Sequence, residues 1–187
     1  RAQRALSEYM GDCHMKNRFL PGLLVGMALM VVLLLAGAYL GIKSGAMPAN
    51  ADAKPSNLER WAARTSLRVT VNRDAPKQAN PVSLSDENLI AGIKLYKENC
   101  SVCHGTSAAE PSAIAQGLYQ RAPQLAKDGV EDDSDGVNFW KITHGIRLTG
   151  MPAFSKTLTD EQRWQIALLL KHMDTLTPRA EKAWRAI

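Results

Sequence analysis

The stretch Cys100-Ser101-Val102-Cys103-His104 is the most informative part of this sequence. It contains two of only three cysteines in 187 residues, and the third cysteine is Cys13. Three cysteines are too few for a disulfide scaffold. A pair of thiols with this spacing, followed directly by a histidine, suits a metal site, a redox dithiol or the attachment of a prosthetic group.

The Cys-x-x-Cys-His pattern predicts one covalently bound haem c. The thiols of Cys100 and Cys103 add to the two haem vinyl groups as thioethers, and His104 is placed to coordinate the iron. A structural zinc site usually needs four ligands, and only this cysteine pair and one histidine cluster in the sequence. A thioredoxin-like dithiol would need a βαβ context, which the sequence does not suggest.

A haem iron held by one protein ligand leaves a second axial position to fill. The candidate side chains downstream are His144, Met151, His172 and Met173. Met151 lies between Gly150 and Pro152, which favour a loop that can present the thioether to the haem. A single methionine is often only core filler. The loop and the His/Met precedent among electron-transfer haems favour Met151 as the second iron ligand.

An apolar run of 24 uncharged residues, 19–42, predicts a single transmembrane helix. At about 1.5 Å per residue such a helix is about 36 Å long, and the hydrocarbon core is about 30 Å thick. A cleavable signal peptide is the alternative, because Ala49-Asn50-Ala51 resembles a cleavage site. The run is longer than the apolar region of about 7–15 residues in a signal peptide, so we expect an uncleaved anchor.

The net charge of +5 is unevenly distributed along the chain. Residues 1–82 hold 11 Lys/Arg and 5 Asp/Glu, whereas residues 83–187 hold 12 and 13. The basic excess therefore flanks the apolar run and indicates a lipid bilayer rather than nucleic acid as the partner. More Lys/Arg precede the run than closely follow it. This predicts a cytoplasmic N-terminus and a periplasmic or extracytoplasmic C-terminal part, in a bacterial inner membrane.

The remaining pattern predicts an all-α chain. Residues 43–82 form a proline-containing linker, with a short helix over 57–65 and a strand-like piece over 67–71. In the following domain we expect a helix over 86–99, capped by Ser85, and a short helix over 136–143. A capping box that begins at Thr159 predicts a further helix to about residue 173.

Residues 83–187 resemble a class I, mono-haem c-type cytochrome domain. The matching pieces are Gly92 and Tyr96, Cys100 to Gly105, Ala122-Pro123-Gln124-Leu125, Thr143-His144-Gly145-Ile146, Thr149-Gly150-Met151-Pro152, and Trp164. The resemblance implies that the first and last helices cross closely at Gly92, beside Tyr96 and Trp164. It also implies that the Pro123 carbonyl accepts a hydrogen bond from the His104 ring.

These features predict a membrane-anchored one-electron carrier. Its parts would be a cytoplasmic segment (1–18), a transmembrane helix (19–42), an extracytoplasmic linker (43–82) and a cytochrome c domain (83–187). We expect it to serve a respiratory or photosynthetic membrane complex, with other subunits and a redox protein as partners, and to have no catalytic residues of its own. A haem-based sensor or ligand-binding module, and a structural subunit, are the alternatives.

Overall fold

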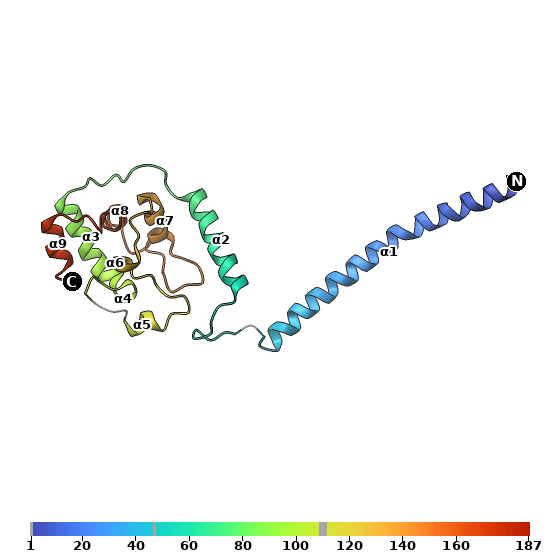
Figure 1. Ribbon diagram of the computed structural model, residues 1–187, viewed down its shortest axis with the longest axis horizontal. Coiled ribbons are helices and arrows are strands. Elements are labelled where there is room, and N and C mark those ends of the chain that lie inside the picture. The colour runs from blue at the N-terminus through green and yellow to red at the C-terminus, as the bar shows by residue number, and fades with distance from the viewer. Residues whose placement is uncertain (1, 47, 109–111) are drawn as a thin grey trace. The chain divides into compact units, whose positions relative to one another are not determined.

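The computed structural model describes residues 2–46, 48–108 and 112–187, with side chains described from Phe19 onward. Its contacts divide the chain into two compact units, Arg1–Ala49 and Asn50–Ile187. Helices follow one another along the chain, and no strand occurs among the described residues (Figure 1). The prediction of an all-α protein is therefore confirmed.

The first unit contains α1, Ala2–Lys43, a single helix. Its part Phe19–Lys43 is long and apolar enough to cross a membrane, in agreement with the predicted span. The helix also continues through residues 2–18, where the sequence predicted only a polar segment.

In the second unit, α3 (Asp86–Asn99) and α8 (Asp160–Lys171) begin where the sequence predicts. The Ser85 hydroxyl accepts a hydrogen bond from the Asn88 amide, and Thr159 forms the expected capping box with Gln162. These side chains satisfy amides that the first helical turn leaves unpaired. The starts of both helices are thus set by local sequence.

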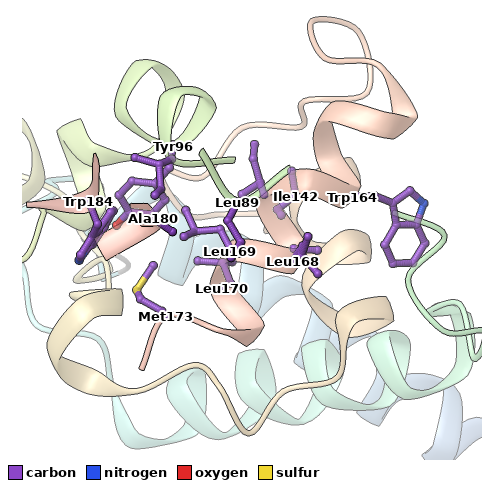
Figure 2. Packing of buried hydrophobic residues seen from close by; sticks show 13 residues of the cluster. Leu89, Tyr96, Ile142, Trp164, Leu168, Leu169, Leu170, Met173, Ala180 and Trp184 are labelled. Carbon is purple, nitrogen blue, oxygen red and sulfur yellow. The ribbon is translucent and has the colours of Figure 1, made fainter. Parts of the chain in front are cut away.

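The core forms where α3 crosses α8 at Gly92. A Cβ atom at this position would lie 2.5 Å from the carbonyl oxygen of Gln165, so only glycine permits the observed approach. Leu89, Ile93 and Leu169, each at most 1% exposed, belong to the core cluster at this crossing. Leu89 and Leu169 are labelled in Figure 2. The close contact of the two helices implied by the family resemblance is therefore present.

Tyr96 and Trp164, expected beside this crossing, both belong to the core cluster, and each has its own aromatic partner. Trp164 stacks on Phe139 of α7 (Asp135–His144), with ring centroids 4.0 Å apart. Tyr96 instead meets Trp184 edge to face at 5.2 Å. Trp184 ends α9 (Pro178–Trp184), a helix that sequence reasoning missed, and the two rings appear together in Figure 2.

The middle of the chain contains the short helices α4 (Ser101–His104), α5 (Ala113–Gln116) and α6 (Leu125–Asp128).

The acidic residues at 131–135, at the start of α7, have contacts within the helical unit. The Asp133 carboxylate lies 2.6 Å from the Lys141 ammonium group, and the backbone carbonyl of Glu131 accepts a hydrogen bond from Lys171.

The prediction of a strand-like piece at 67–71 is wrong, because α2 runs from Asn57 to Asp74 as one helix. Val71 is 4% exposed while Val69 is 57% exposed, which matches a helix packed on one face. The helix contacts α7, and the Pro76 carbonyl lies so close to Gly136 that a Cβ atom there would overlap it. Asn80 also donates to the Trp164 carbonyl at 3.1 Å. Residues 71–80 are thus tied to the helical unit, while the domain boundaries proposed from the sequence stay predictions.

We expect Gly92→Ala to destabilise the second unit. Alanine favours a helix over glycine by about 1 kcal/mol, but the added Cβ overlaps the Gln165 carbonyl. The expected net loss is about 1–3 kcal/mol, measured by denaturant unfolding followed by circular dichroism. Gly117→Ala is the control, because its Cβ would meet nothing nearer than 3.6 Å. Equal unfolding midpoints for both variants would contradict the close crossing.

Candidate haem site

The Cys-x-x-Cys-His stretch forms a tight turn at the end of α3. Cys100 is the C-cap of α3, and its carbonyl accepts hydrogen bonds from the amides of Cys103 (3.1 Å) and His104 (2.9 Å). Gly105 ends α4 with φ +67°, a conformation that favours glycine. The buried hydroxyl of Tyr96 donates to the Gly105 carbonyl at 2.9 Å. The turn is therefore held both by its own backbone and by the core.

A cavity of about 130 Å³ opens beside this turn. Its lining includes all four side chains that the sequence predicted to hold a haem: Cys100, Cys103, His104 and Met151. Most of the remaining wall is apolar and includes Leu118, Ala122, Pro123, Ile142, Ile146, Pro152 and Phe154. The fold thus brings the cysteine turn and the methionine loop to one apolar cavity.

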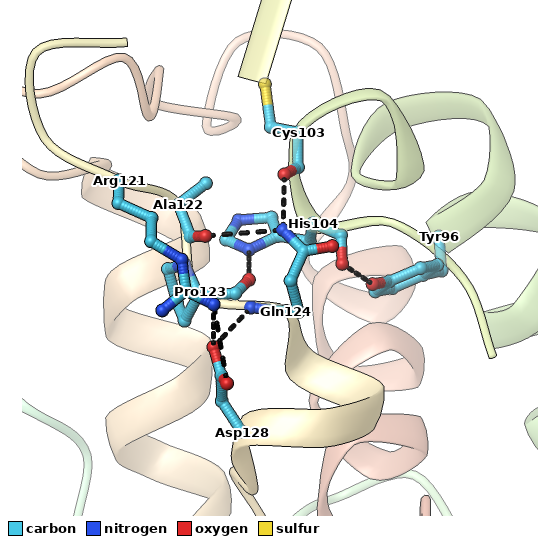
Figure 3. A network of polar contacts seen from close by, with 8 residues as sticks. All are labelled: Tyr96, Cys103, His104, Arg121, Ala122, Pro123, Gln124 and Asp128. Carbon is cyan, nitrogen blue, oxygen red and sulfur yellow. Dashed lines mark hydrogen bonds and ion pairs between the residues drawn. The ribbon is translucent and has the colours of Figure 1, made fainter. Parts of the chain in front are cut away.

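The imidazole of His104 is oriented by the backbone. Its Nδ1 atom lies 2.8 Å from the Pro123 carbonyl oxygen (Figure 3). A carbonyl can only accept, so Nδ1 carries the proton and Nε2 retains its lone pair. Burial lowers the pKa of His104, and the hydrogen bond to Pro123 opposes this shift. A neutral imidazole with a free Nε2 is the form that coordinates a metal.

Gln124 and Asp128 stabilise the segment that carries Pro123. The Asp128 carboxylate accepts from the Gln124 amide at 2.7 Å, and the Gln124 side-chain amide donates to the Cys103 carbonyl at 3.3 Å (Figure 3). Arg121 also contacts the Asp128 carboxylate at 3.1 Å. Sequence reasoning did not identify Gln124 or Asp128 as supports of His104, because the contacts depend on how the segment folds back on α4.

Both cysteines of the motif are partly buried. Burial raises the pKa of the Cys100 thiol to about 12, and the nearby Cys103 adds to this shift. As a free thiol, Cys100 is therefore uncharged at neutral pH. No group of three or more His, Cys, Asp or Glu side chains suited to a metal ion occurs among the described residues.

Met151 reaches the cavity from a closely packed loop. The Met151 amide donates to the Thr149 hydroxyl at 3.1 Å, and its carbonyl accepts from the Ile146 amide at 3.2 Å. A Cβ atom at Gly150 would lie 2.5 Å from the Leu118 side chain, so the loop packs directly against the cavity wall. These contacts fix the position of the methionine backbone.

The other candidate ligands lie elsewhere. The His144 ring lies against Trp140, with centroids 4.9 Å apart, His172 caps the end of α8, and Met173 is 8% exposed in the core. Among the described residues, the cavity lining includes Met151 but none of these three.

The residues present fit a covalently bound haem c. Two thiols and an imidazole project from one helical turn, a thioether comes from another loop, and apolar side chains supply most of the wall. Each donor type matches what thioether attachment and His/Met ligation require.

The helical fold and this site define the class of a c-type cytochrome domain. Residues 87–170 match the family model described as cytochrome C oxidase, cbb3-type, subunit III. The chain therefore contains a c-type cytochrome domain that follows an N-terminal apolar helix.

Two further comparisons add little to this assignment. A chain of the reducing HAO-like protein complex of Kuenenia stuttgartiensis is similar at 23% sequence identity and a TM-score of 0.41. The similarity covers 51% of this chain and 48% of that chain, about half of either. No curated protein matches the chain.

We expect Tyr96→Phe to destabilise the domain by about 1–3 kcal/mol, because the buried Gly105 carbonyl loses its donor. Tyr119→Phe is the matched control, since it removes an exposed hydroxyl that donates to Glu59 at 2.6 Å. Its expected cost is within about 0.5 kcal/mol. Denaturant unfolding of both variants checks the prediction, and a larger loss for Tyr119→Phe would contradict it.

Proposed function

We propose that this chain is a one-electron carrier with a single haem c. Cys100 and Cys103 form the thioethers, and His104 and Met151 are the axial ligands of the iron. The observation that carries the proposal is that these four side chains line one cavity with a largely apolar wall. The cytochrome family match supports the class of function.

When bound, the haem supplies a reversible one-electron couple. The protein supplies the surroundings that adjust it. The Pro123 carbonyl holds the His104 ring through Nδ1 and increases the electron donation of Nε2. A soft thioether from Met151 and apolar neighbours such as Ile142 and Phe154 favour the reduced iron and a raised potential.

This ligand set favours a carrier over a catalyst. Two axial ligands from the protein leave no open position on the iron for a substrate. The sequence offers no catalytic triad or carboxylate pair beside this site, so we assign no catalytic residue. Any enzymatic activity would then belong to a complex in which this chain moves electrons.

We further propose that α1 is a single-pass anchor in a bacterial inner membrane. The apolar part, Phe19–Lys43, has sufficient length, and the charge bias favours a cytoplasmic N-terminus with the haem domain in the periplasm. Gly22, Gly26, Gly37 and Gly41 each have open space where a Cβ atom would be, which would let another helix approach closely. This supports a role as a subunit of a respiratory or photosynthetic complex.

The axial ligand is tested by Met151→Leu and Met151→His. The leucine variant should bind carbon monoxide in its reduced form, because it leaves one axial position open. The histidine variant should lower the potential by on the order of 0.2 V, within the range of about 0.8 V that axial ligands control. Reduced-minus-oxidised spectra and potentiometric titration measure both effects.

Met173→Leu is the matched control, because Met173 is buried in the core and does not line the cavity. It should leave the spectrum and the potential unchanged. Rapid and complete carbon monoxide binding by the unaltered protein would instead favour the haem sensor. A Met151 variant that lowers the potential without slowing electron flow through the host complex would favour a structural subunit.

Covalent attachment is tested by replacing the cysteines one at a time. Cys100→Ala and Cys103→Ala should each leave one vinyl group unreacted, which shifts the pyridine haemochrome band to longer wavelength. The double variant should lose haem staining on a denaturing gel. Cys13→Ala, which removes the third cysteine, should retain both the normal band and the stain. Unchanged staining in the double variant would rule out thioether attachment.

A further inference from the structure

The N-terminal two thirds of α2 form a basic surface that the proposed electron carrier does not use. Arg60, Arg64 and Arg68 recur every four residues, so they follow one side of the helix. With Asn57, Trp61 and Thr65 they line a shallow groove of about 500 Å³. We call these three arginines the arginine row.

Among the residues whose side chains the structure describes, no acid neutralises the charge of the arginine row. The neighbouring acids have other partners, since Glu59 accepts from the Tyr119 hydroxyl at 2.6 Å and Asp74 pairs with Arg73 at 2.7 Å. Arg60 donates to the uncharged Asn57 amide oxygen at 2.5 Å. In the part of the chain that the structure describes, no ion pair involves the arginine row.

Large apolar side chains of the same helix are also exposed to solvent. Leu58 is 72% exposed, Trp61 is 65% exposed and Val69 is 57% exposed. At about 100° per residue, Leu58 and Val69 point in nearly the same direction, and Trp61 lies between them and the arginines. The buried Val71 follows Arg64 by seven residues, so it lies on the side of the arginine row and points away from Leu58 and Val69. There the C-terminal part of the helix packs against the unit. The exposed surface is therefore amphipathic.

The position of α2 in the chain indicates what this surface meets. Only residues 44–56 separate α1 from α2, and 13 residues extend at most about 45 Å. If α1 is a membrane anchor, the N-terminal end of α2 stays within this distance of the bilayer surface. Arginines beside exposed tryptophan and leucine are the composition of helices that lie in a membrane interface.

We propose that α2 binds the surface of an anionic bilayer, with the arginine row on lipid phosphates and with Leu58, Trp61 and Val69 in the interface. This rests on the membrane anchor of the proposed function. Because Val71, Pro76 and Asn80 hold the C-terminal end of α2 to the helical unit, binding would restrict how the cytochrome domain tumbles above the membrane.

The test places a photo-crosslinking benzoylphenylalanine in the full chain in place of Trp61. The protein is reconstituted in vesicles of phosphatidylcholine alone or mixed with phosphatidylglycerol, and lipid adducts are measured by mass spectrometry after illumination. A second protein carries the same probe in place of Leu148, which is 86% exposed on the Met151 loop, and reports non-specific contact. We expect adducts at position 61 that increase with phosphatidylglycerol and decrease with salt.

Two charge variants distinguish the effect of the arginine row on the adduct yield from the effect of net charge. Replacing Arg60, Arg64 and Arg68 together by Gln should lower the adduct yield at position 61 at least about fivefold. This is a lower bound, because the loss of a single arginine near an anionic surface is expected to weaken binding by about that factor. Replacing the exposed residues Lys94, Lys97 and Lys156 by Gln removes the same charge elsewhere and should not lower it.

Several results would overturn the proposal. These are equal yields in neutral and anionic vesicles, equal losses in both charge variants, or equal yields at positions 61 and 148. Illumination of native membranes that gives a protein adduct instead of a lipid adduct would assign α2 to a partner subunit. Failure of the anchor itself is distinguishable, because the chain would then be released from the vesicles by alkaline carbonate. Haem staining of the same samples monitors the carrier function independently.

Discussion

The close crossing of α3 and α8 at Gly92 is the constraint on which the rest of the helical unit depends. It brings the α3 backbone against the Gln165 carbonyl and surrounds the contact with buried leucine and isoleucine. Cys100 caps the same helix, so the crossing also determines where the first thiol lies relative to the core. Tyr96, one turn earlier, bonds to the Gly105 carbonyl just beyond His104. The motif is thereby held at both of its ends, which is what a rigid redox centre requires.

Local signals predicted the core helices well, and non-local packing explains where prediction failed. Ser85 and the Thr159 capping box set helix starts that depend on neighbouring residues alone. The alternating pattern over residues 67–71 has the period of a strand, yet the burial of Val71 and the exposure of Val69 follow a helix that packs on one side. For α9, the start signal Thr177-Pro178 was present, but only the contact of Trp184 with Tyr96 gives the helix a role in the core.

The surroundings of His104 were predictable only in part. The Pro123 carbonyl was expected from the family resemblance, and the structure places it 2.8 Å from Nδ1. The Gln124 and Asp128 contacts behind it were not expected, because hydrogen bonds from a loop to a distant turn leave no periodic pattern in a sequence. Such supporting groups hold the ring orientation on which the proposed ligation depends.

The sequence by itself determined the Cys-x-x-Cys-His turn, the apolar segment of α1 and the all-helical class, because each follows from residue types and short-range spacing. Only the tertiary structure decided that Met151, and not His144, His172 or Met173, lines the cavity with His104. The same is true of α2, which packs on the helical unit at one end and leaves its arginine row exposed at the other. The physical reason is the same in both cases. The position of a loop or an amphipathic helix depends on contacts such as Gly150 with Leu118 and Gly136 with Pro76, which join residues far apart in the chain.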